Sequence, residues 1–154
     1  MIRSLKEKEY KLLEEFLYQA IYIPEGFSPL ERSILQDPDL QMYVEDFGQK
    51  VGDFAFAAEE NGQIVGIVWV RLMKDYGYYN DKTPSLSISL LPEFRSKGLG
   101  QQLMIAMLNL LKSKGYPSVS LSVSKENPAV RFYRRFGFVI VEDRQDDYLM
   151  FSTL

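Results

Sequence analysis

A glycine-containing turn at residues 95–100, with the sequence Arg-Ser-Lys-Gly-Leu-Gly, holds residue types that bind anions. An alternating stretch at 85–90 predicts a strand before it, and apolar residues spaced by three or four predict a helix after it. Such a turn points free backbone N–H groups and the positive end of the helix dipole at one position. Glycine leaves the backbone open, and Arg95 and Lys97 add charge. The turn therefore predicts a phosphate or pyrophosphate site.

The spacing of this turn excludes two common nucleotide loops. It lacks the GxxxxGK[ST] spacing of a nucleoside-triphosphate loop and the GxGxxG fingerprint of a dinucleotide-binding unit. Taken alone, the hexapeptide is equally consistent with an ordinary strand-to-helix turn. A second motif further along the chain favours the functional interpretation.

The second motif covers residues 127–138, with the sequence Asn-Pro-Ala-Val-Arg-Phe-Tyr-Arg-Arg-Phe-Gly-Phe. Asn127 is a strong helix N-cap, and Pro128 fits the first helical position. Gly137 stands where a glycine commonly ends a helix. Strands are predicted on both sides, at 119–123 and 138–141.

Together the two motifs resemble those of the GCN5-related N-acetyltransferase (GNAT) family. The turn is similar to the family's pyrophosphate-binding motif, and residues 127–138 are similar to its second motif, in the same order and at the same separation. The resemblance covers residues 85–141, while the N-terminal half is similar only in its pattern of elements. It implies an α/β fold of the acyl-CoA N-acyltransferase architecture, a mixed, mostly antiparallel central sheet flanked by helices.

The resemblance also implies an N-acetyltransferase of class EC 2.3.1, in which an amine attacks acetyl-CoA directly. Acetyl-CoA would lie between two splayed parallel strands, here 85–90 and 119–123. The pantetheine arm would bond the backbone at the end of the first strand, N–H groups of the turn would hold the pyrophosphate, and Asn127 would contact the cofactor arm as well as cap its helix. The implied coenzyme-binding residues are Leu90, Leu91, Arg95, Ser96, Lys97, Gly98, Leu99, Gly100, Gln101 and Asn127.

Tyr133 is the catalytic residue that the resemblance implies, because it occupies the motif position of the family's general-acid tyrosine. It would protonate the leaving thiolate. The alternative is core packing beside Phe132 and Phe136. Three cations on the same predicted helix could reach the 3′-phosphate of the coenzyme or form a solvated face: Arg131, Arg134 and Arg135.

The general base is where the sequence departs from the family. Many members carry a glutamate on or near the strand before the turn, but Ser85, Ser87 and Ser89 occupy the polar positions here. Serine cannot act as a base unassisted. The alternatives are a water chain, an amine that binds in its neutral form, or a carboxylate from the N-terminal half such as Glu25 or Asp75.

The resemblance places the acceptor between the segment after the first helix and the loop before residue 85. Exposed aromatic side chains there could cage an organic amine through cation–π contacts. A small-molecule amine is the favoured acceptor, and a protein or peptide acetyltransferase or a non-catalytic acyl-CoA sensor are the alternatives. Trp69 and Arg71 could also face this pocket, although core packing suits Trp69 better. The aromatic candidates are Tyr22, Phe27, Tyr76, Tyr78 and Tyr79.

Composition excludes several enzyme classes. The 154 residues contain no cysteine and no histidine, which excludes a cysteine nucleophile, a Ser-His-Asp triad and histidine metal sites, so that no metal is expected. Residues 1–80 carry 14 acidic and 8 basic side chains, and residues 81–154 carry 7 and 10. The basic half thus holds the predicted phosphate site, while the net charge of −3 argues against nucleic-acid binding.

The length suits a single domain over residues 1–154, with a homodimer left open. No apolar run reaches membrane-spanning length and the first residues form no signal-peptide pattern, so we expect a cytoplasmic protein without a membrane partner. The expected elements of the N-terminal half are an edge strand at 2–3, a helix opened by a capping box at Ser4, a short helix at 30–35 and helical turns within 39–47. Strands at 54–58 and 64–71 flank an Asn61-Gly62 hairpin turn, and a last hairpin turns at 144–146.

Overall fold

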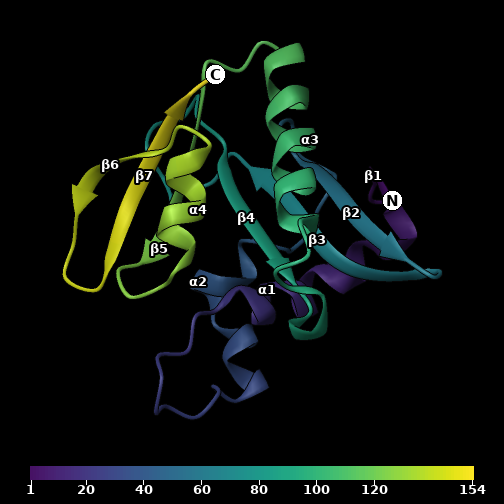
Figure 1. The fold of residues 1–154 in the computed structure, drawn as a ribbon. Coiled ribbons are helices and arrows are strands. Elements are labelled where there is room, and N and C mark those ends of the chain that lie inside the picture. The colour runs from purple at the N-terminus through teal and green to yellow at the C-terminus, as the bar shows by residue number, and fades with distance from the viewer.

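Seven strands form one sheet in the computed structural model, which describes residues 1–154 (Figure 1). The strand order is β1-β2-β3-β4-β5-β7-β6, and every neighbouring pair is antiparallel except β4 and β5. The predicted mixed, mostly antiparallel sheet is therefore confirmed. The strands are β1 Ile2–Ser4, β2 Phe54–Glu60, β3 Gln63–Arg71, β4 Ser85–Leu90, β5 Ser118–Ser124, β6 Val139–Asp143 and β7 Asp147–Thr153.

Helices cover both faces of the sheet, and each face has its own core (Figure 1). The core on the α3 and α4 side contains 16 buried residues, and the core on the α1 side contains 11. Because side chains alternate along a strand, Val68 and Val70 of β3 join the first core, while Ile67 and Trp69 join the second. The helices are α1 Leu13–Ala20, α2 Pro38–Gln41, α3 Leu99–Ser113 and α4 Ala129–Arg135, with 3₁₀ segments Glu7–Leu12, Arg32–Gln36 and Pro92–Phe94.

The N-terminal helix begins later than the sequence predicts. The predicted capping box at Ser4 is wrong, because Ser4 is the last residue of β1 and pairs with Phe56. The first helical turn begins at Glu7, and the Lys6 N–H donates to the Glu9 carboxylate at 2.8 Å. Pairing with β2 therefore moves the helix start toward the C-terminus, and the capping carboxylate moves with it.

Most other elements agree with the prediction. Asn61 and Gly62 form the turn between β2 and β3 with φ values of 52° and 79°, which Asn-Gly turns adopt readily. The predicted helix at 30–35 is the 3₁₀ segment Arg32–Gln36, and α2 with the turns after it occupies residues 38–48. None of the helices combines the length and the apolar character that crossing a bilayer requires.

Trp69 and Arg71 are buried on the α1 side of the sheet, and neither lines the main cleft of the molecule. The Trp69 indole N–H donates to the Tyr43 carbonyl at 3.0 Å. The Arg71 side chain, 1% exposed, donates to both carboxylate oxygens of Asp53 at 3.0 and 3.1 Å and to two carbonyls of the preceding segment. These bonds fasten residues 42–53 to β3.

Replacement of Asp53 by alanine is expected to lower the free energy of unfolding by about 3–5 kcal/mol, because the Arg71 charge would stay buried without its partner. Urea unfolding of the purified variants measures this change. Asp146→Ala, at an exposed turn position, is the control and should stay within about 0.5 kcal/mol of wild type. An equal effect of the two substitutions would contradict the role assigned to the buried pair.

Candidate active site

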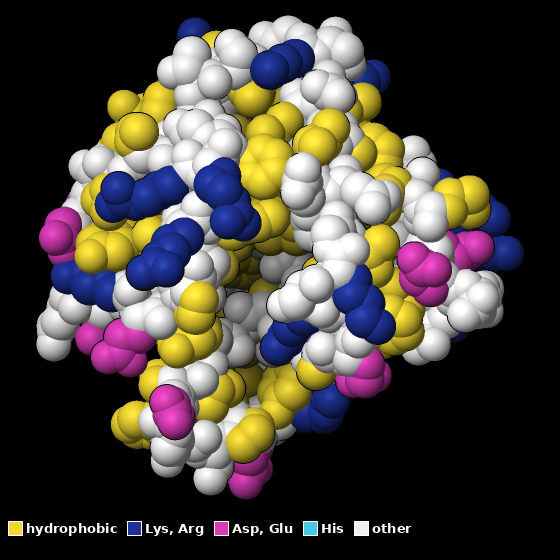
Figure 2. Space-filling view, viewed as in Figure 1, with side chains coloured by type: hydrophobic (Ala, Val, Ile, Leu, Met, Phe, Trp, Pro, Cys, Tyr) yellow, Lys and Arg dark blue, Asp and Glu magenta, His cyan; other side chains and the backbone are white.

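The central cleft opens where β4 and β5 separate. The strands pair only at Ser85 and Ser120, where the Ser120 N–H donates to the Pro84 carbonyl at 3.0 Å. Beyond this point a cleft of about 1090 Å³ lies between the end of α1, β4, the turn before α3, and α4. Figure 2 shows it as a hollow near the centre of the face, with Lys and Arg side chains on both sides. The splayed strand pair that the resemblance implies is thus present.

The glycine-containing turn forms the cleft wall at the start of α3. Ser96 and Gly98 adopt left-handed φ values of 61° and 85°, and the helix begins at Leu99. The Gly98 carbonyl accepts the first helical bond, from the Gln102 N–H at 3.2 Å, so the preceding N–H groups have no acceptor within the helix. No acidic residue lies in the first turn. This geometry suits an anion.

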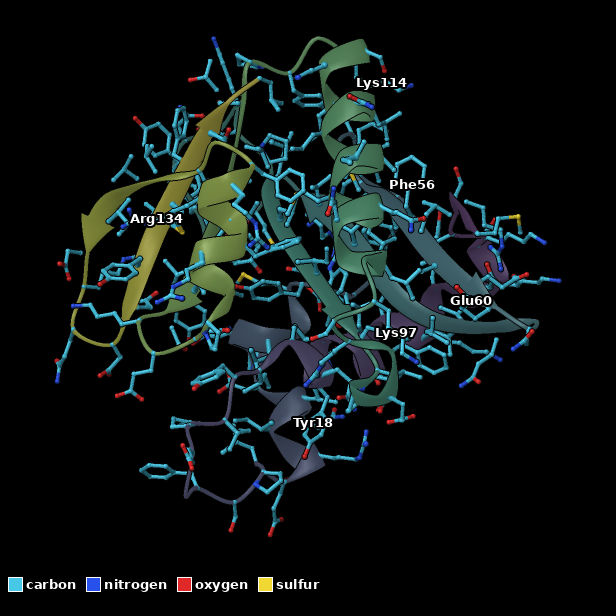
Figure 3. The ribbon with its side chains drawn as sticks, viewed as in Figure 1. Tyr18, Phe56, Glu60, Lys97, Lys114 and Arg134 are labelled. Carbon is cyan, nitrogen blue, oxygen red and sulfur yellow. The ribbon has the colours of Figure 1, made fainter.

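Three of the predicted coenzyme-binding residues do not line the cleft. Leu99 is buried in the core, and the Leu91 N–H donates to the Val65 carbonyl of β3 at 2.8 Å. Lys97 lies beside the start of α3 in Figure 3, and its ammonium stands 5.4 Å from the ring centroid of Phe94. The residues that do line the cleft are Leu90, Arg95, Ser96, Gly98, Gly100, Gln101 and Asn127.

Arg95 turns toward the sheet and α1. Its guanidinium donates to the Leu90 carbonyl at 3.2 Å and to the Gln19 carbonyl at 3.4 Å. From its place in the turn, the Arg95 charge is expected beside a phosphate. In the structure it joins the end of β4 to the end of α1 across one wall of the cleft, an arrangement that depends on tertiary contacts and has no local sequence signal.

The backbone edge of β4 faces the gap. The Leu90 carbonyl points there, since it accepts the bond from Arg95. The two-residue repeat of a strand turns the backbone groups of Ile88 the same way, and both residues line the cleft. An extended ligand could therefore add to β4 as a further strand.

Asn127 and α4 form the opposite wall. The Asn127 side-chain oxygen accepts the Ala129 N–H at 2.9 Å and its carbonyl accepts the Val130 N–H at 3.1 Å, which is the capping geometry that the sequence predicts. Gly137, with φ of 91°, follows the end of the helix. Arg135 is the one cation of α4 that lines the cleft, while Arg134 is exposed (Figure 3).

Tyr133 combines burial with access to the cleft. Its ring packs edge-on against Phe132 and Phe138, with centroids 5.6 and 5.9 Å apart, and the residue lines the cleft. Burial raises the pKa of its hydroxyl to about 12. The phenol is therefore protonated at neutral pH and lines the cleft as a proton donor.

The α1 side of the cleft is aromatic and apolar. Tyr18 and Tyr22 line it together with Ile21, Ile23, Pro29 and Leu30. The Tyr18 hydroxyl donates to the Leu30 carbonyl, and the Arg32 guanidinium lies 4.4 Å from the Tyr18 ring centroid, so this side chain (Figure 3) fastens the loop after α1. Tyr18 is a cleft residue outside the predicted set, although its position one helical turn before Tyr22 indicates that the two share a side.

Four of the five predicted acceptor aromatics lie outside the cleft. Phe27 is 72% exposed, Tyr76 and Tyr79 are exposed at the surface, and the Tyr78 hydroxyl donates to a neighbouring aspartate. Only Tyr22 lines the cleft. The predicted aromatic cage is therefore not assembled by these residues.

Carboxylates are absent from the cleft wall. Its 22 lining residues include Arg95 and Arg135 but no aspartate or glutamate. Glu25, one candidate base, is exposed on the loop after α1. Asp75, the other, lies beside the first residue of β4 and accepts a hydrogen bond from the Ser85 hydroxyl at 2.7 Å.

Comparison with known proteins agrees with this geometry. Residues 17–138 match the profile of the Acetyltransferase (GNAT) family. The solved PaiA N-acetyltransferase of Thermoplasma acidophilum, in complex with coenzyme A, superposes with a TM-score of 0.74 over 100% of this chain and 98% of that chain, at 19% identity. At that identity the likeness supports the fold alone.

Two kinds of curated relative match part of the chain. The chain is 31% identical to the mycothiol acetyltransferase of Thermobifida fusca over 117 residues, which are 73% of this chain and 36% of that protein. It is 32% identical to the N-alpha-acetyltransferase of Sulfurisphaera tokodaii over 116 residues, 64% of this chain and 68% of the relative. The chain thus spans only about a third of the length of the first group.

Proposed function

The chain belongs to the GNAT acetyltransferase family, and we propose that it acts as a single-domain N-acetyltransferase that moves an acetyl group from acetyl-CoA directly to a primary amine of a small molecule. One observation carries the proposal. A single cleft joins the free N–H groups at the start of α3, the open backbone edge of β4 and the buried phenol Tyr133. In this order, the three features suit the pyrophosphate, the pantetheine arm and the thioester of acetyl-CoA.

The coenzyme would be held mainly by the backbone. Its pyrophosphate meets the N–H groups at the start of α3, where the dipole is positive and no acidic side chain competes. Its pantetheine arm pairs with Ile88 and Leu90 along β4. The Arg95 guanidinium releases the Leu90 carbonyl or shares it, and Arg135 adds charge on the opposite wall.

The chemistry proceeds without a covalent enzyme intermediate. The amine nitrogen forms a bond to the thioester carbon, and the C–S bond breaks. A backbone N–H at the open edge of β4 stabilises the charge that develops on the carbonyl oxygen. Tyr133, which is protonated at neutral pH, gives its proton to the thiolate as the C–S bond breaks.

The acceptor would carry an apolar or aromatic group and one amine. The α1 side of the cleft offers Tyr18, Tyr22 and aliphatic side chains, and the wall holds no carboxylate to bind the further charges of a polyamine. Similarity to the mycothiol acetyltransferases supports a small-molecule acceptor. Similarity to N-alpha-acetyltransferases supports a second candidate, the N-terminus of a peptide, whose first side chain would occupy the same apolar surface.

CoA release from acetyl-CoA, measured against a panel of amines and a pool of peptides, tests the proposal. We expect turnover with a monoamine that bears an aromatic or aliphatic group, and little with polyamines. Turnover with peptides alone would favour the second candidate. Saturable acetyl-CoA binding without turnover on either panel would favour an acyl-CoA sensor.

Tyr133→Phe is expected to lower kcat by about 100-fold or more while acetyl-CoA binds within about threefold of wild type, since only the transferable proton is lost. Steady-state kinetics and calorimetric titration measure the two quantities. Tyr116→Phe, at a half-buried tyrosine that packs on Phe54 away from the cleft, is the matched control and should leave both unchanged. An undiminished kcat in Tyr133→Phe would remove the acid from the mechanism.

Alanine substitutions at two glycines, one at each end of α3, distinguish an effect of backbone strain from an effect on coenzyme binding. Gly98 and Gly115 both have φ of 85° with open space where an added methyl group would stand, so alanine should cost each about 1–2 kcal/mol of stability. Gly98→Ala should also weaken CoA binding by about fivefold or more, close to 1 kcal/mol. Gly115→Ala should not. Equal CoA affinities of the two variants would argue against the anion site at the start of α3.

A further inference from the structure

Asp75 is a buried carboxyl group that the mechanism above does not use. Its Oδ2 accepts the Ser85 hydroxyl at 2.7 Å, while its Oδ1 is buried without a hydrogen-bond partner. A buried carboxylate is costly unless its charge is compensated, so its presence needs an explanation. This carboxyl therefore calls for a role beyond packing.

The carboxyl lies at the narrow end of the gap between β4 and β5. A methyl group placed on Gly77 would come within 2.4 Å of the Ser85 hydroxyl oxygen, 3.1 Å of the Ser122 nitrogen and 3.2 Å of Asp75 Oδ2. The Ser120 hydroxyl donates to the Gly77 carbonyl at 2.6 Å, which fastens this loop to β5. Asp75 thus stands beside both strands just where they separate.

Three serines of β4 stand between Asp75 and the cleft, and the last of them, Ser89, lines the cleft. Ser85, Ser87 and Ser89 share the α1 face of β4, because side chains alternate along a strand. Ser85 bonds Asp75 and Ser89 bonds the Phe16 carbonyl at 2.6 Å, while Ser87 between them is half-buried. Alternate residues of a strand lie about 7 Å apart, a distance that a hydroxyl and one solvent molecule can bridge.

The geometry points to Asp75 as the proton-accepting group of acetyl transfer, acting on the acceptor amine through the Ser85 hydroxyl and solvent in the cleft. This inference rests on the proposed function. The ammonium form of the acceptor gives up one proton before attack, and the nitrogen gives up a second after the C–N bond forms. One proton restores Tyr133, which has protonated the thiolate, and the other leaves to solvent by way of Asp75. The stoichiometry of an amide, a thiol and one released proton is then complete.

The surroundings of Asp75 suit this role. The groups that face it are the Tyr43 hydroxyl from the segment after α2, the Ser85 hydroxyl from β4 and the backbone amide of Gly77. Burial raises the pKa of the Asp75 carboxyl above its ordinary value, and the neighbouring hydroxyls offset only part of that shift. A base with a raised pKa accepts a proton more readily at neutral pH than an exposed aspartate does.

The same shift fixes the sign of the stability effect. The pKa of Asp75 is higher in the folded state than in the unfolded state. At a pH above the folded-state pKa, the charged carboxylate therefore lowers the free energy of unfolding. This destabilisation disappears when the pH falls below the pKa of the unfolded state. Asparagine removes the charge at nearly constant shape. Asp75→Asn should therefore have a Tm at pH 7 that is equal to or above that of wild type, even as activity falls.

The test compares wild type, Asp75→Asn and Ser85→Ala with Asp81→Asn, at an exposed aspartate of the same loop, as the matched control. We expect Asp75→Asn to lower kcat by about 10- to 100-fold with the KM for acetyl-CoA unchanged, Ser85→Ala to lower it less, and Asp81→Asn to match wild type. Profiles of kcat/KM against pH, recorded with two amines of different pKa, separate the enzyme from the acceptor. If Asp75 is the base, the acidic limb of the kcat/KM profile keeps the same midpoint pH with both amines. The same limb is then absent from the profile of Asp75→Asn.

Each outcome decides a different point. An active wild type with an unchanged Asp75→Asn, or an acidic limb that moves only with the amine, overturns the role of Asp75 and leaves the proposed function standing. A clear drop in the Tm of Asp75→Asn marks a structural carboxylate and overturns the inference as well. A wild type that acetylates no amine or peptide overturns the proposed function, and the inference with it.

Discussion

The loss of pairing between β4 and β5 is the constraint on which the rest of the molecule depends. Parallel strands normally continue to pair, because unpaired backbone N–H and C=O groups are costly when buried. Here the pairing stops after Ser85 and Ser120, and the freed Leu90 carbonyl is satisfied by Arg95. Gly77 fills the narrow end of the gap, where a larger residue would meet Ser85 and the Ser122 backbone. The packing of the β3–β4 loop against both strands therefore helps to keep β4 and β5 apart.

The strand separation also places two helices. α3 follows β4 and α4 follows β5, so the beginnings of these helices stand on opposite sides of the gap (Figure 1). One presents a helix N-terminus free of acidic side chains, and the other presents the buried phenol Tyr133. The separation of the strands thus determines how far the anion site lies from the acid.

The parts of the site that the sequence predicted are those made by local chain geometry. The left-handed turn at Ser96 and Gly98 and the cap at Asn127 need only neighbouring residues, and both are present. The orientation of Arg95 depends on a carbonyl 76 residues away, and no local pattern encodes it. The bond from Tyr18 to the loop after α1 is also a tertiary contact, although the helical spacing of Tyr18 and Tyr22 indicates that both face the same side. The prediction of an aromatic acceptor site was wrong for four of its five residues for the same reason. Composition gives the number of aromatic residues but not the direction in which a loop orients their side chains. The helix start at Ser4 failed because sheet pairing outweighs a local capping signal.

Burial raises the pKa of two groups on opposite faces of the sheet, with opposite consequences for chemistry. Tyr133 belongs to the core on the α3 and α4 side, and its raised pKa keeps the phenol protonated at neutral pH. Asp75 lies on the α1 side, where the same physical cause makes a carboxylate readier to accept a proton. An acid and a base that touched would satisfy each other through a hydrogen bond and be less free to act on a substrate. The sheet lies between the two groups, so no direct hydrogen bond joins them.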